Sequence, residues 1–558
     1  MTTAATASPT EIAPGTLIRR TWRVPRENGS ALIAPAWEEL SSIIPHNQQR
    51  FAAASAIDVQ GKSLSTLRQQ AHDEALQTAI EYTTSVLQLP PPPGSMNGPL
   101  IVGGHQPELF HTGVWAKNFA VARLAQHTSG VPLQLIVDQD TLNSTSIKIP
   151  VGTRDTPALT SIDFDGPHLR SPWEEAAIAD ADIFKSVGRR VTEGLASWGY
   201  RPLIADVWLT AVQQARRTGR LVDAFTAVRA ATERRWGAGT LELPMSRWWT
   251  QPAPLWFMAH LLAHHRRLAG IYNSVVREYR IANRVRSRAH PVPDLAQQDD
   301  WFEAPFWIWQ EGDPRRDRLF VRQVGAELQL RDSRRTVGAL PLDESRSATD
   351  AVAVLQQWTQ QGWRLRTRAL TTTWAARMLL ADVFIHGLGG AKYDEMTDAL
   401  IGRFWGCLPP EFATVSATIH LPLGEPFPET MKTVGARRHD LSDALHNPER
   451  HWDGAWPDAV LSLVAEKQRW LATANSMDPS LTTRQRRAEN HRRDQRLREI
   501  RRQLDQLAEP VLRRLHGELD IAVARLAANR VLQRREFSWV LYPEAELRTT
   551  IDKLFPMM

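Results

Sequence analysis

The run Pro99-Leu100-Ile101-Val102-Gly103-Gly104-His105-Gln106-Pro107 decides how the fold is interpreted. The apolar stretch Leu100–Val102 predicts a buried strand, and the two glycines that follow predict a tight turn. Helical periodicity runs from Val114 to Gln126, and a second apolar run, Leu133 to Val137, predicts another strand. Strand, turn, helix and strand in this order indicate a βαβ unit. Its two strands are expected to be parallel and joined by a right-handed crossover.

Outward from this unit, the chain shows several changes of pattern. A helical N-terminal part ends in the stiff run Pro90 to Gly94, and long helical patterns occupy about 173–290. The aromatic stretch Trp301 to Trp309 is strand-like, and Leu319 to Leu330 alternates around Gly325 as a hairpin does. We therefore expect an α/β protein with a leader and proline linker over 1–98, a parallel-sheet core over 99–455 with a helical insertion at about 173–290, and a helical region over 456–558.

The C-terminal region carries an apolar seam at spacings of three and four, formed by Leu497, Ile500, Leu504, Leu507, Val511, Leu515, Leu519 and Leu526. This pattern predicts a long coiled-coil helix, bent at Pro510. Because the seam has no obvious partner in its own segment, it predicts a homodimer.

Composition excludes several classes of protein. The 558 residues contain 42% hydrophobic and 23% charged residues, typical of a globular protein, and no stretch has the roughly 18 consecutive apolar residues of a membrane helix. Cys407 is the only cysteine, so an intrachain disulfide and a cysteine zinc cluster are excluded. Met1 to Pro14 lacks the layout of a secretory signal, and we expect a disordered tip and a cytoplasmic protein.

The net charge of +6 is concentrated in one segment, Arg484 to Arg502, with nine arginines against three acidic residues. A basic helical face binds polyanions in some proteins and is simply solvated in most. No aromatic residues are interleaved with these arginines, so nucleic acid is not the expected partner.

The first group of candidate functional residues is Gly103, Gly104, His105, Gln106 and His111, followed one turn into the helix by Lys117. In a parallel sheet, ligands bind at the carboxyl ends of strands, where glycines and helix N-termini accommodate phosphate. A histidine there can stabilise phosphate charge or act as an acid or base, and Lys117 can add a positive charge. The alternative is a tight turn whose polar residues only cap the helix.

Two further groups follow other strand-like runs. Asp138 and Asp140 come directly after the second strand, where carboxylates can hold Mg²⁺, a ribose or an amine, or merely cap a turn. His386, Gly387, Gly389 and Lys392 form a glycine-rich turn that can cradle an anion or simply connect a strand to a helix. Because carboxyl ends of parallel strands share one edge, we expect His105, Asp138, Asp140 and the turn at Gly387–Gly390 to line one cleft.

At these residues the chain resembles the cysteine-adding enzymes of bacillithiol synthesis. The run Gly104-His105-Gln106 followed by Glu108-Leu109-Phe110 is similar to the family's Gly-Gln-Gln and Gly-Leu-Phe, and Val137-Asp138-Gln139-Asp140 is similar to its Glu-Asp-His-Asp. Gly387 and Gly389 with Tyr393 match a later glycine turn, and Val415 to Thr418 resembles the family's Ser-Ala-Thr strand. The chain departs from the family at His105 and at Gly390, where the family has Gln and Glu.

The resemblance implies a Rossmann-like core similar to class I nucleotidyltransferases, a helical insert and dimerisation through the C-terminal helix. It also implies condensation of cysteine with a glucosaminyl-malate amine. The residues at the strand ends lead to the hypothesis of an ATP- or nucleotide-dependent ligase or nucleotidyltransferase that acts on a small amine or sugar-derived substrate, with Asp138 and Asp140 holding the amine, a ribose or Mg²⁺. In this hypothesis His105, Gln106, Asp138 and Asp140 are catalytic. The rival hypothesis is a non-catalytic dimeric scaffold whose basic face binds a polyanion.

Overall fold

The described part of the computed structural model comprises residues 13–94, 96–168, 170–287, 289–313, 315–472 and 480–557. The tip Met1 to Pro14 is expected to be disordered, but residues 1–12 of it lie outside the described residues. The chain divides into two units: unit 1 is Met1–Ile149, Thr160–Leu421 and Arg535–Met558, and unit 2 is Pro150–Leu159 and Pro422–Arg534. None of the described helices combines the length and hydropathy needed to cross a membrane.

Unit 1 is built on a mixed sheet whose six strands, among the described residues, have the order β1-β16-β15-β4-β5-β8. Their bounds are β1 (Ser30–Ala34), β16 (Phe412–Thr418), β15 (Val383–His386), β4 (Leu100–His105), β5 (Val131–Ile136) and β8 (Leu241–Pro244). The edge strand β1 is antiparallel to β16, and the other neighbours are parallel. The prediction that the first two strands are adjacent and parallel is therefore confirmed, since β4 and β5 pair from Leu100–Val131 to His105–Ile136.

The helix between these two strands, α3 (Thr112–His127), packs against β4, β5 and β16. Its side chains are buried almost throughout, and its Trp115 stacks on Trp539 near the C-terminus with ring centroids 4.5 Å apart. Unlike an amphipathic surface helix, α3 is covered on all sides, which explains why its sequence lacks a polar stripe.

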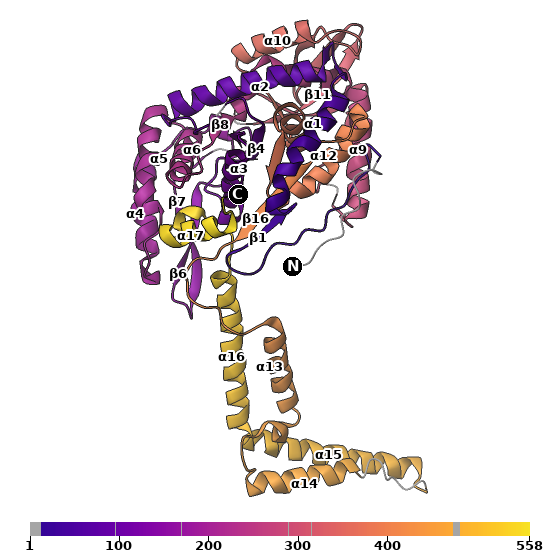
Figure 1. Ribbon diagram of the computed structural model, residues 1–558. Coiled ribbons are helices and arrows are strands. Elements are labelled where there is room, and N and C mark those ends of the chain that lie inside the picture. Colours follow the sequence, from indigo (N-terminus) through magenta and orange to yellow (C-terminus); the bar gives the residue numbers. More distant parts are fainter. Residues whose placement is uncertain are drawn as a thin grey trace. The chain divides into compact units, whose positions relative to one another are not determined.

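The remaining helices of unit 1 surround this sheet (Figure 1). They are α1 (Ile43–Ala54), α2 (Leu64–Glu81), α4 (Ala181–Gly194), α5 (Ile204–Thr218), α6 (Leu221–Arg235), α7 (Met245–Trp248), α8 (Pro252–Ala263), α9 (His265–Ala282), α10 (Thr349–Gln360), α11 (Ala369–Ala375), α12 (Leu388–Trp405) and α17 (Glu544–Leu554). Ser63 caps α2 by accepting a hydrogen bond from the backbone of Thr66, as its place before an apolar run predicts.

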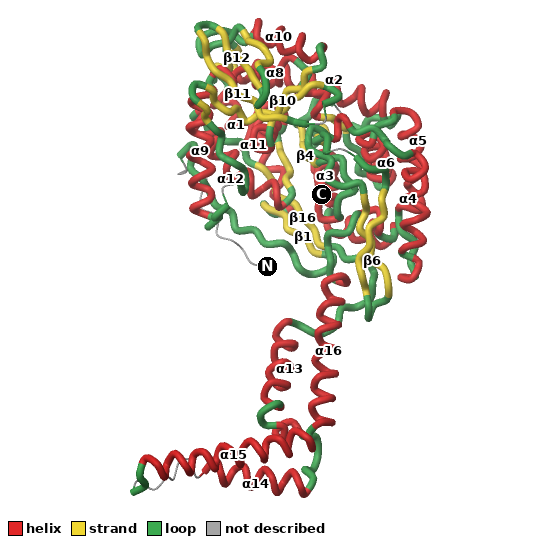
Figure 2. Tube along the Cα trace, turned by 180° about the vertical axis from the view of Figure 1, so that it is seen from behind, coloured by secondary structure: helices red, strands yellow, loops and turns green. Residues whose placement is uncertain are grey.

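A second, antiparallel sheet in unit 1 has the order β13-β12-β11-β10-β14, with β9 also on β10. Its strands are β9 (Gln297–Gln298), β10 (Trp301–Gln310), β11 (Asp317–Val324), β12 (Glu327–Arg331), β13 (Thr336–Leu340) and β14 (Trp363–Thr367). The strand-like aromatic stretch and the hairpin around Gly325 are thus confirmed, the glycine having a φ of 60°. Helix α10 packs against β13 and β14, and Figure 2 shows it beside the strands of this sheet.

Several chain segments join the main sheet from outside the expected core. The segment 173–290, expected as a helical insertion, contains the sheet strand β8 as well as α4 to α9. The leader 1–98 supplies the edge strand β1, and the last helix, α17, belongs to unit 1. Short two-stranded sheets are formed by β2 (Asp58–Val59) with β3 (Lys62–Ser63) and by β6 (Ser146–Gly152) with β7 (Pro157–Asp163).

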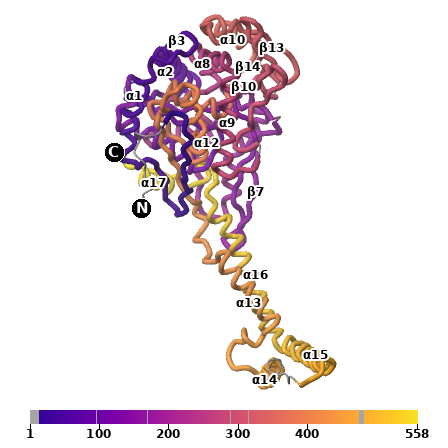
Figure 3. The backbone as a smooth tube through the Cα atoms, turned by 90° about the vertical axis from the view of Figure 1, so that its right-hand side faces the viewer, coloured from indigo at the N-terminus to yellow at the C-terminus, as the bar shows by residue number. Residues whose placement is uncertain are grey.

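The helices of unit 2 are α13 (Met431–Ala444), α14 (Asp458–Ala472), α15 (Thr483–Leu507) and α16 (Glu509–Leu532). The pattern expected as one long helix is divided at Ala508, next to Pro510, so the expected bend lies where α15 ends and α16 begins. Figure 3 shows α13 beside α16, and Figure 1 shows α14 beside α15.

The apolar seam of this region has partners within its own chain. Ile500 and Leu504 of α15 cluster with Val460 and Val464 of α14. In the same way Val511 and Leu515 of α16 cluster with apolar side chains of α13. The statement that the seam lacks a partner is therefore corrected, because helices α13 and α14, which were not recognised in the sequence, cover it.

Candidate functional site

The candidate residues gather at the carboxyl edge of the main sheet. Strand β4 ends at His105, β15 ends at His386, and β5 ends just before Val137. Because these strands are parallel, their carboxyl ends share one edge, where α3 and α12 begin. The chain leaves β4 for β5 on one side and later returns to β15 on the other, so the strand order reverses between β4 and β15. Such a reversal is where open α/β sheets bind ligands.

Gly103 and Gly104 belong to β4 and not to the turn, which begins at Gln106. A Cβ at Gly103 would lie 2.9 Å from a methyl group of Val121 in α3, and one at Gly104 would lie 2.9 Å from the Cβ of Leu135 in β5. These glycines therefore allow close packing of β4 against its neighbours, and the expectation that they cradle a phosphate is not supported by their surroundings.

His105 is partly buried at the end of β4, with its ring 4.9 Å from that of Phe110, centroid to centroid. Its Nδ1 lies 3.2 Å from the carbonyl oxygen of Gln106, which can only accept, so Nδ1 carries the proton and Nε2 is left as an acceptor. Burial, reinforced by the charge of Lys117, lowers the pKa of His105 to about 3. The imidazole is thus neutral and offers hydrogen bonds rather than a positive charge.

Two of the expected phosphate-binding residues have structural roles. Lys117 is 1% exposed and donates to the carbonyl of Gly104, while burial and Arg229 lower its pKa to about 7. His111 caps α3, its Nδ1 accepting from the backbone of Gly113 at 3.1 Å. His111 therefore has the helix-capping role that was the alternative to ligand binding. Lys117 does not reach the sheet edge as a free cation.

Gln106 and Asp140 meet at this edge. The Gln106 amide donates to Oδ2 of Asp140 at 2.9 Å, and Arg316 lies 3.3 Å from Oδ1 of the same carboxylate. Arg316 also donates to the carbonyl of Gln139 at 2.6 Å and to the hydroxyl of Thr141. Asp140 keeps 40% of its side chain exposed, so it remains accessible to a ligand.

Asp138 faces inward instead. It is 1% exposed, and its two carboxylate oxygens accept from the backbone and the hydroxyl of Ser246 at the start of α7. Burial, reinforced by the charge of Glu174, raises the pKa of Asp138 to about 7. The expectation that Asp138 lines the cleft with Asp140 is not met, because its carboxylate is taken up by this helix N-terminus.

The same contacts bear on the expected Mg²⁺ site. Asp138 is occupied by Ser246, and Asp140 is paired with a guanidinium group, which is a poor neighbour for a divalent cation. Within the described residues, no three His, Cys, Asp or Glu side chains converge as metal ligands. The carboxylates as placed do not fit a protein-bound Mg²⁺ ion.

The turn after β15 is partly buried and partly open. Gly387 is the N-cap residue of α12, and Gly389 and Lys392 are exposed on its first turns. His386 is buried, with Nε2 2.6 Å from Oδ2 of Asp394, and that carboxylate also pairs with Arg377 at 2.8 Å. His386 is therefore held inside an ion-pair network, whereas the glycine turn itself is available at the edge.

A small polar cavity lies beside His105 and Gln106, between the ends of β4 and β5 and helix α6. Three of its side chains have a buried polar atom without a hydrogen-bond partner among the described residues: Oδ1 of Asn118, Nε2 of Gln134 and Oγ1 of Thr226. The amide of Asn118 is oriented by Glu233, which accepts from its Nδ2 at 2.8 Å. Buried polar groups are usually hydrogen-bonded, so these three atoms are free to bind a water molecule or the polar group of a ligand that reaches the cavity. The cavity is not lined by His111, Asp138 or Asp140.

Sequence reasoning missed most of this lining. Gln134 had a visible signal, since it is polar in the middle of the apolar run that forms β5. Asn118 is likewise polar within the helix that follows the first strand. Thr226 comes from the segment that was interpreted as a helical insertion, and no local pattern connects it with the edge. Arg316, which pairs with Asp140 outside the cavity, was also not singled out in the sequence.

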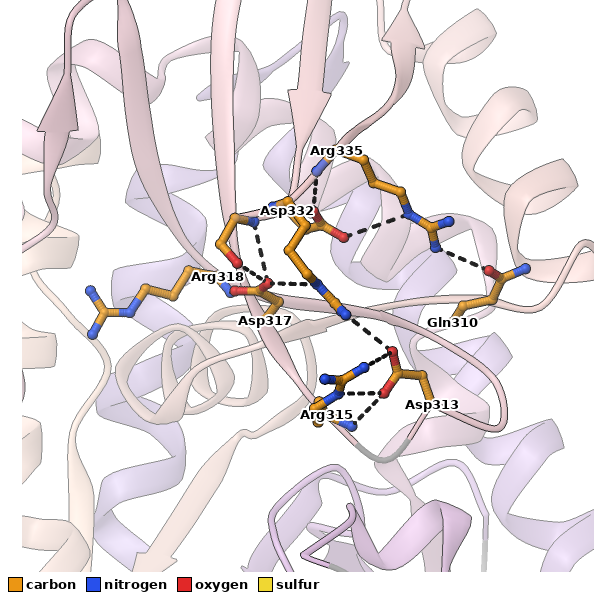
Figure 4. A network of polar contacts seen from close by, with 9 residues as sticks. Gln310, Asp313, Arg315, Asp317, Arg318, Asp332 and Arg335 are labelled. Atoms are coloured by element: carbon orange, nitrogen blue, oxygen red, sulfur yellow. Dashed lines mark hydrogen bonds and ion pairs between the residues drawn. The ribbon is translucent and has the colours of Figure 1, made fainter.

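The loop that carries Arg316 is fixed by a network of polar contacts with the turn between β12 and β13 (Figure 4). Asp313 accepts from Arg315 at 3.1 Å and from Arg334 at 3.3 Å. Asp317 accepts from the backbone of Ser333 at 3.3 Å, and Asp332 accepts from the backbone of Arg335 at 2.7 Å. This network holds the strand ends that flank Arg316.

The fold and this edge define a mixed α/β protein with a small polar cavity at the end of its parallel strands. Neither a protein-family model nor a curated protein sequence matches the chain. Its function is therefore inferred from the site itself.

Proposed function

We propose that unit 1 is a Rossmann-like, nucleotide-dependent ligase or nucleotidyltransferase-like enzyme that acts on a small amine. The observation that carries this proposal is the polar cavity beside His105 and Gln106 at the carboxyl end of β4, the strand on one side of the point where the strand order reverses. Counted in chain order, the five parallel strands follow the order 3-2-1-4-5, which is typical of doubly wound nucleotide-binding sheets.

Groups suited to a nucleotide lie along this edge. The N-termini of α3 and α12 supply backbone N–H groups and the positive ends of two helix dipoles. His105 and Gln106 add neutral hydrogen-bonding groups, and Asp140 adds a carboxylate that can hold an amine or a ribose hydroxyl.

The chemistry of such an enzyme is mostly positioning and charge stabilisation. A carboxylate oxygen of one substrate attacks the nucleotide's α-phosphorus, and pyrophosphate leaves. The amine of the second substrate then attacks the activated carbonyl carbon and displaces the nucleoside monophosphate, losing one proton. In this scheme Asp140 orients the amine, and His105 donates to the phosphate oxygens as a neutral group after a turn of its ring.

A titration of the protein with ATP tests the proposal. We expect His105→Ala to reduce nucleotide-dependent turnover by about 10²–10³-fold, as is usual when one charge-stabilising donor is lost, with a smaller effect on stability. His127→Ala is the matched control, because His127 is exposed at the far end of α3. Full activity of His105→Ala, or no heat of ATP binding to the wild-type protein, would remove the proposed function.

The resemblance to the cysteine-adding enzymes of bacillithiol synthesis makes a thiol-containing amino acid the first substrate to try in that assay. We also retain self-association through unit 2 as a proposal. It now depends on exposed apolar side chains such as Ile521 and Val523 of α16, since Ile500, Leu504, Val511 and Leu515 of the seam are covered within the chain. Light scattering on the full-length protein tests it, and a monomer would contradict it.

The alternative, a scaffold that binds polyanions, is favoured by one observation. Helix α15 exposes several arginines, including Arg484, Arg487, Arg492 and Arg498, on unit 2. Binding of heparin that weakens steeply with salt and is lost on charge reversal of these arginines would support it.

A further inference from the structure

A group of arginines lies where the second sheet of unit 1 meets the end of β5. Arg316 reaches the backbone of Gln139 and the carboxylate of Asp140, and Gln139 in turn donates to Thr367 at the end of β14. The guanidinium groups of Arg316 and Arg368 lie over the ring of Trp307, at 5.0 and 4.4 Å from its centroid. These contacts bring Arg368 to the same neighbourhood as Asp140.

The charges of this group are unequally compensated. Arg366 makes a two-bond ion pair with Glu174, at 3.0 and 2.8 Å. Arg368 has one ion-pair partner, Oε1 of Glu303, which lies 2.7 Å from Nη1. Only 10% of the Arg368 side chain is exposed, and its Nε and Nη2 atoms are buried. Even so, these two atoms have no hydrogen-bond partner among the described residues.

Nε and Nη2 form one side of the guanidinium plane, the fork that receives both oxygens of a carboxylate or phosphate in parallel hydrogen bonds. Leaving charged donors buried and unpaired destabilises a protein, so this fork needs an explanation. In addition, burial lowers the pKa of Arg316, and the positive charge of Arg368 acts in the same direction. Each of the three arginines has one carboxylate partner, but Arg368 alone is left with an unpaired side of its guanidinium plane.

We propose that the free fork of Arg368, on the face of Trp307, binds the oxyanion of a small ligand, either a carboxylate or a phosphate group. The site lies next to the edge that carries Gln106 and Asp140, so a ligand held here extends toward that edge. The inference goes beyond the proposed function, because it requires neither a nucleotide nor catalysis.

Calorimetric titrations with succinate and with inorganic pyrophosphate, each without nucleotide, test the site and distinguish its two ligand chemistries. Arg368→Lys keeps a positive charge near Glu303 but removes the fork. We expect it to weaken binding of the preferred oxyanion by roughly tenfold or more. Arg318→Lys is the matched control, since Arg318 also approaches Glu303, at 3.5 Å, but is half-exposed and has no free buried fork. Its affinity should stay within about twofold of the wild type.

Thermal unfolding provides the second readout. The bound oxyanion should raise the melting temperature of the wild type and of Arg318→Lys, but not of Arg368→Lys. Equal binding by Arg368→Lys and the wild type, or no binding of either probe at millimolar concentration, would overturn the inference. Failure of ATP to bind in the separate titration would remove the proposed function and leave this site standing.

Discussion

Asp138 is the residue whose environment differs most from the one its sequence position suggested. It follows an apolar strand like Asp140, yet it is buried, and its pKa is raised to about 7 chiefly by desolvation. A carboxyl group with a raised pKa binds more protons in the folded than in the unfolded state. Its contribution to stability is therefore present below pH 4 and is lost as the pH rises from about 4 to 7.

We predict that Asp138→Asn removes this dependence. The amide resembles the protonated carboxyl group and can still accept from the backbone of Ser246. The unfolding free energy of the variant minus that of the wild type should grow between pH 4 and 7, by at most about 4 kcal/mol, and level off above. Urea titrations across this range measure it. A difference that does not change with pH would show that Asp138 is ionised throughout.

Thr226 provides a second test at the residue scale, because its hydroxyl faces the cavity without a partner among the described residues. We predict that Thr226→Val leaves the free protein as stable as the wild type or stabilises it by about 1 kcal/mol, and weakens ATP binding. Thr232→Val, on the same helix, is the control. Its hydroxyl bonds to the carbonyl of Val228 at 2.7 Å, so no gain in stability is expected. Destabilisation by Thr226→Val alone would mean that the hydroxyl is satisfied.

At the scale of elements, the first turns of α3 and α12 occupy equivalent places after β4 and β15 but differ in how closely they pack. A Cβ at Gly113 in α3 would lie 2.4 Å from the carbonyl oxygen of Ala417 in β16. A Cβ at Gly389 in α12 would have no neighbour within 4 Å. The first turn of α3 therefore packs tightly against the sheet, whereas the first turn of α12 has free space around Gly389.

We therefore predict opposite effects of alanine at these two glycines. Gly113→Ala should destabilise unit 1 by about 1–3 kcal/mol, because a strand backbone cannot give way. Gly389→Ala should leave stability unchanged or raise it by up to about 1 kcal/mol, since alanine favours helix. Chemical denaturation of the two variants decides. Equal losses would mean that the turn of α12 is packed against something as well.

The extent to which sequence predicts this fold also depends on the element. The βαβ unit was predicted correctly because β4 and β5 are continuous apolar runs, bounded by turn residues and close in the chain. Strand β8 was missed, since Leu241–Pro244 is four residues long and lies among helices. Its place at the sheet edge comes from tertiary packing, which local periodicity does not record.

For the site, sequence located the edge but assigned some of the wrong side chains to it. His105, Gln106 and Asp140 follow strands and lie where topology places ligands. Lys117 was misassigned because a lysine one turn into a helix can face either the edge or the sheet, and here α3 is buried on all sides. Arg368 contacts Glu303 and Trp307 in another strand of the second sheet and reaches the neighbourhood of Asp140 only through tertiary packing, so sequence spacing offers no indication of its role.

At the scale of the whole molecule, each unit has apolar clusters of its own among the described residues, in unit 1 around the main sheet and in unit 2 between paired helices. Units with their own cores can unfold in separate steps. We predict two calorimetric transitions, and we expect ATP to raise the midpoint temperature of only one of them. Leu504→Ala opens a cavity between α14 and α15. It should lower the midpoint of the other transition alone, with a loss of about 2–5 kcal/mol in the unfolding free energy of unit 2. A single transition would show that the two units unfold together.

The central claim, that the carboxyl edge at β4 and β15 binds a nucleotide, is tested most directly by a crystal structure of the protein with a non-hydrolysable ATP analogue. We expect the analogue to lie at this edge, with its phosphates near the N-termini of α3 and α12 and a polar group of the ligand hydrogen-bonded to Gln106 or to Asn118, Gln134 or Thr226. An analogue bound elsewhere, or its absence from the edge at saturating concentration, would contradict nucleotide binding at this edge.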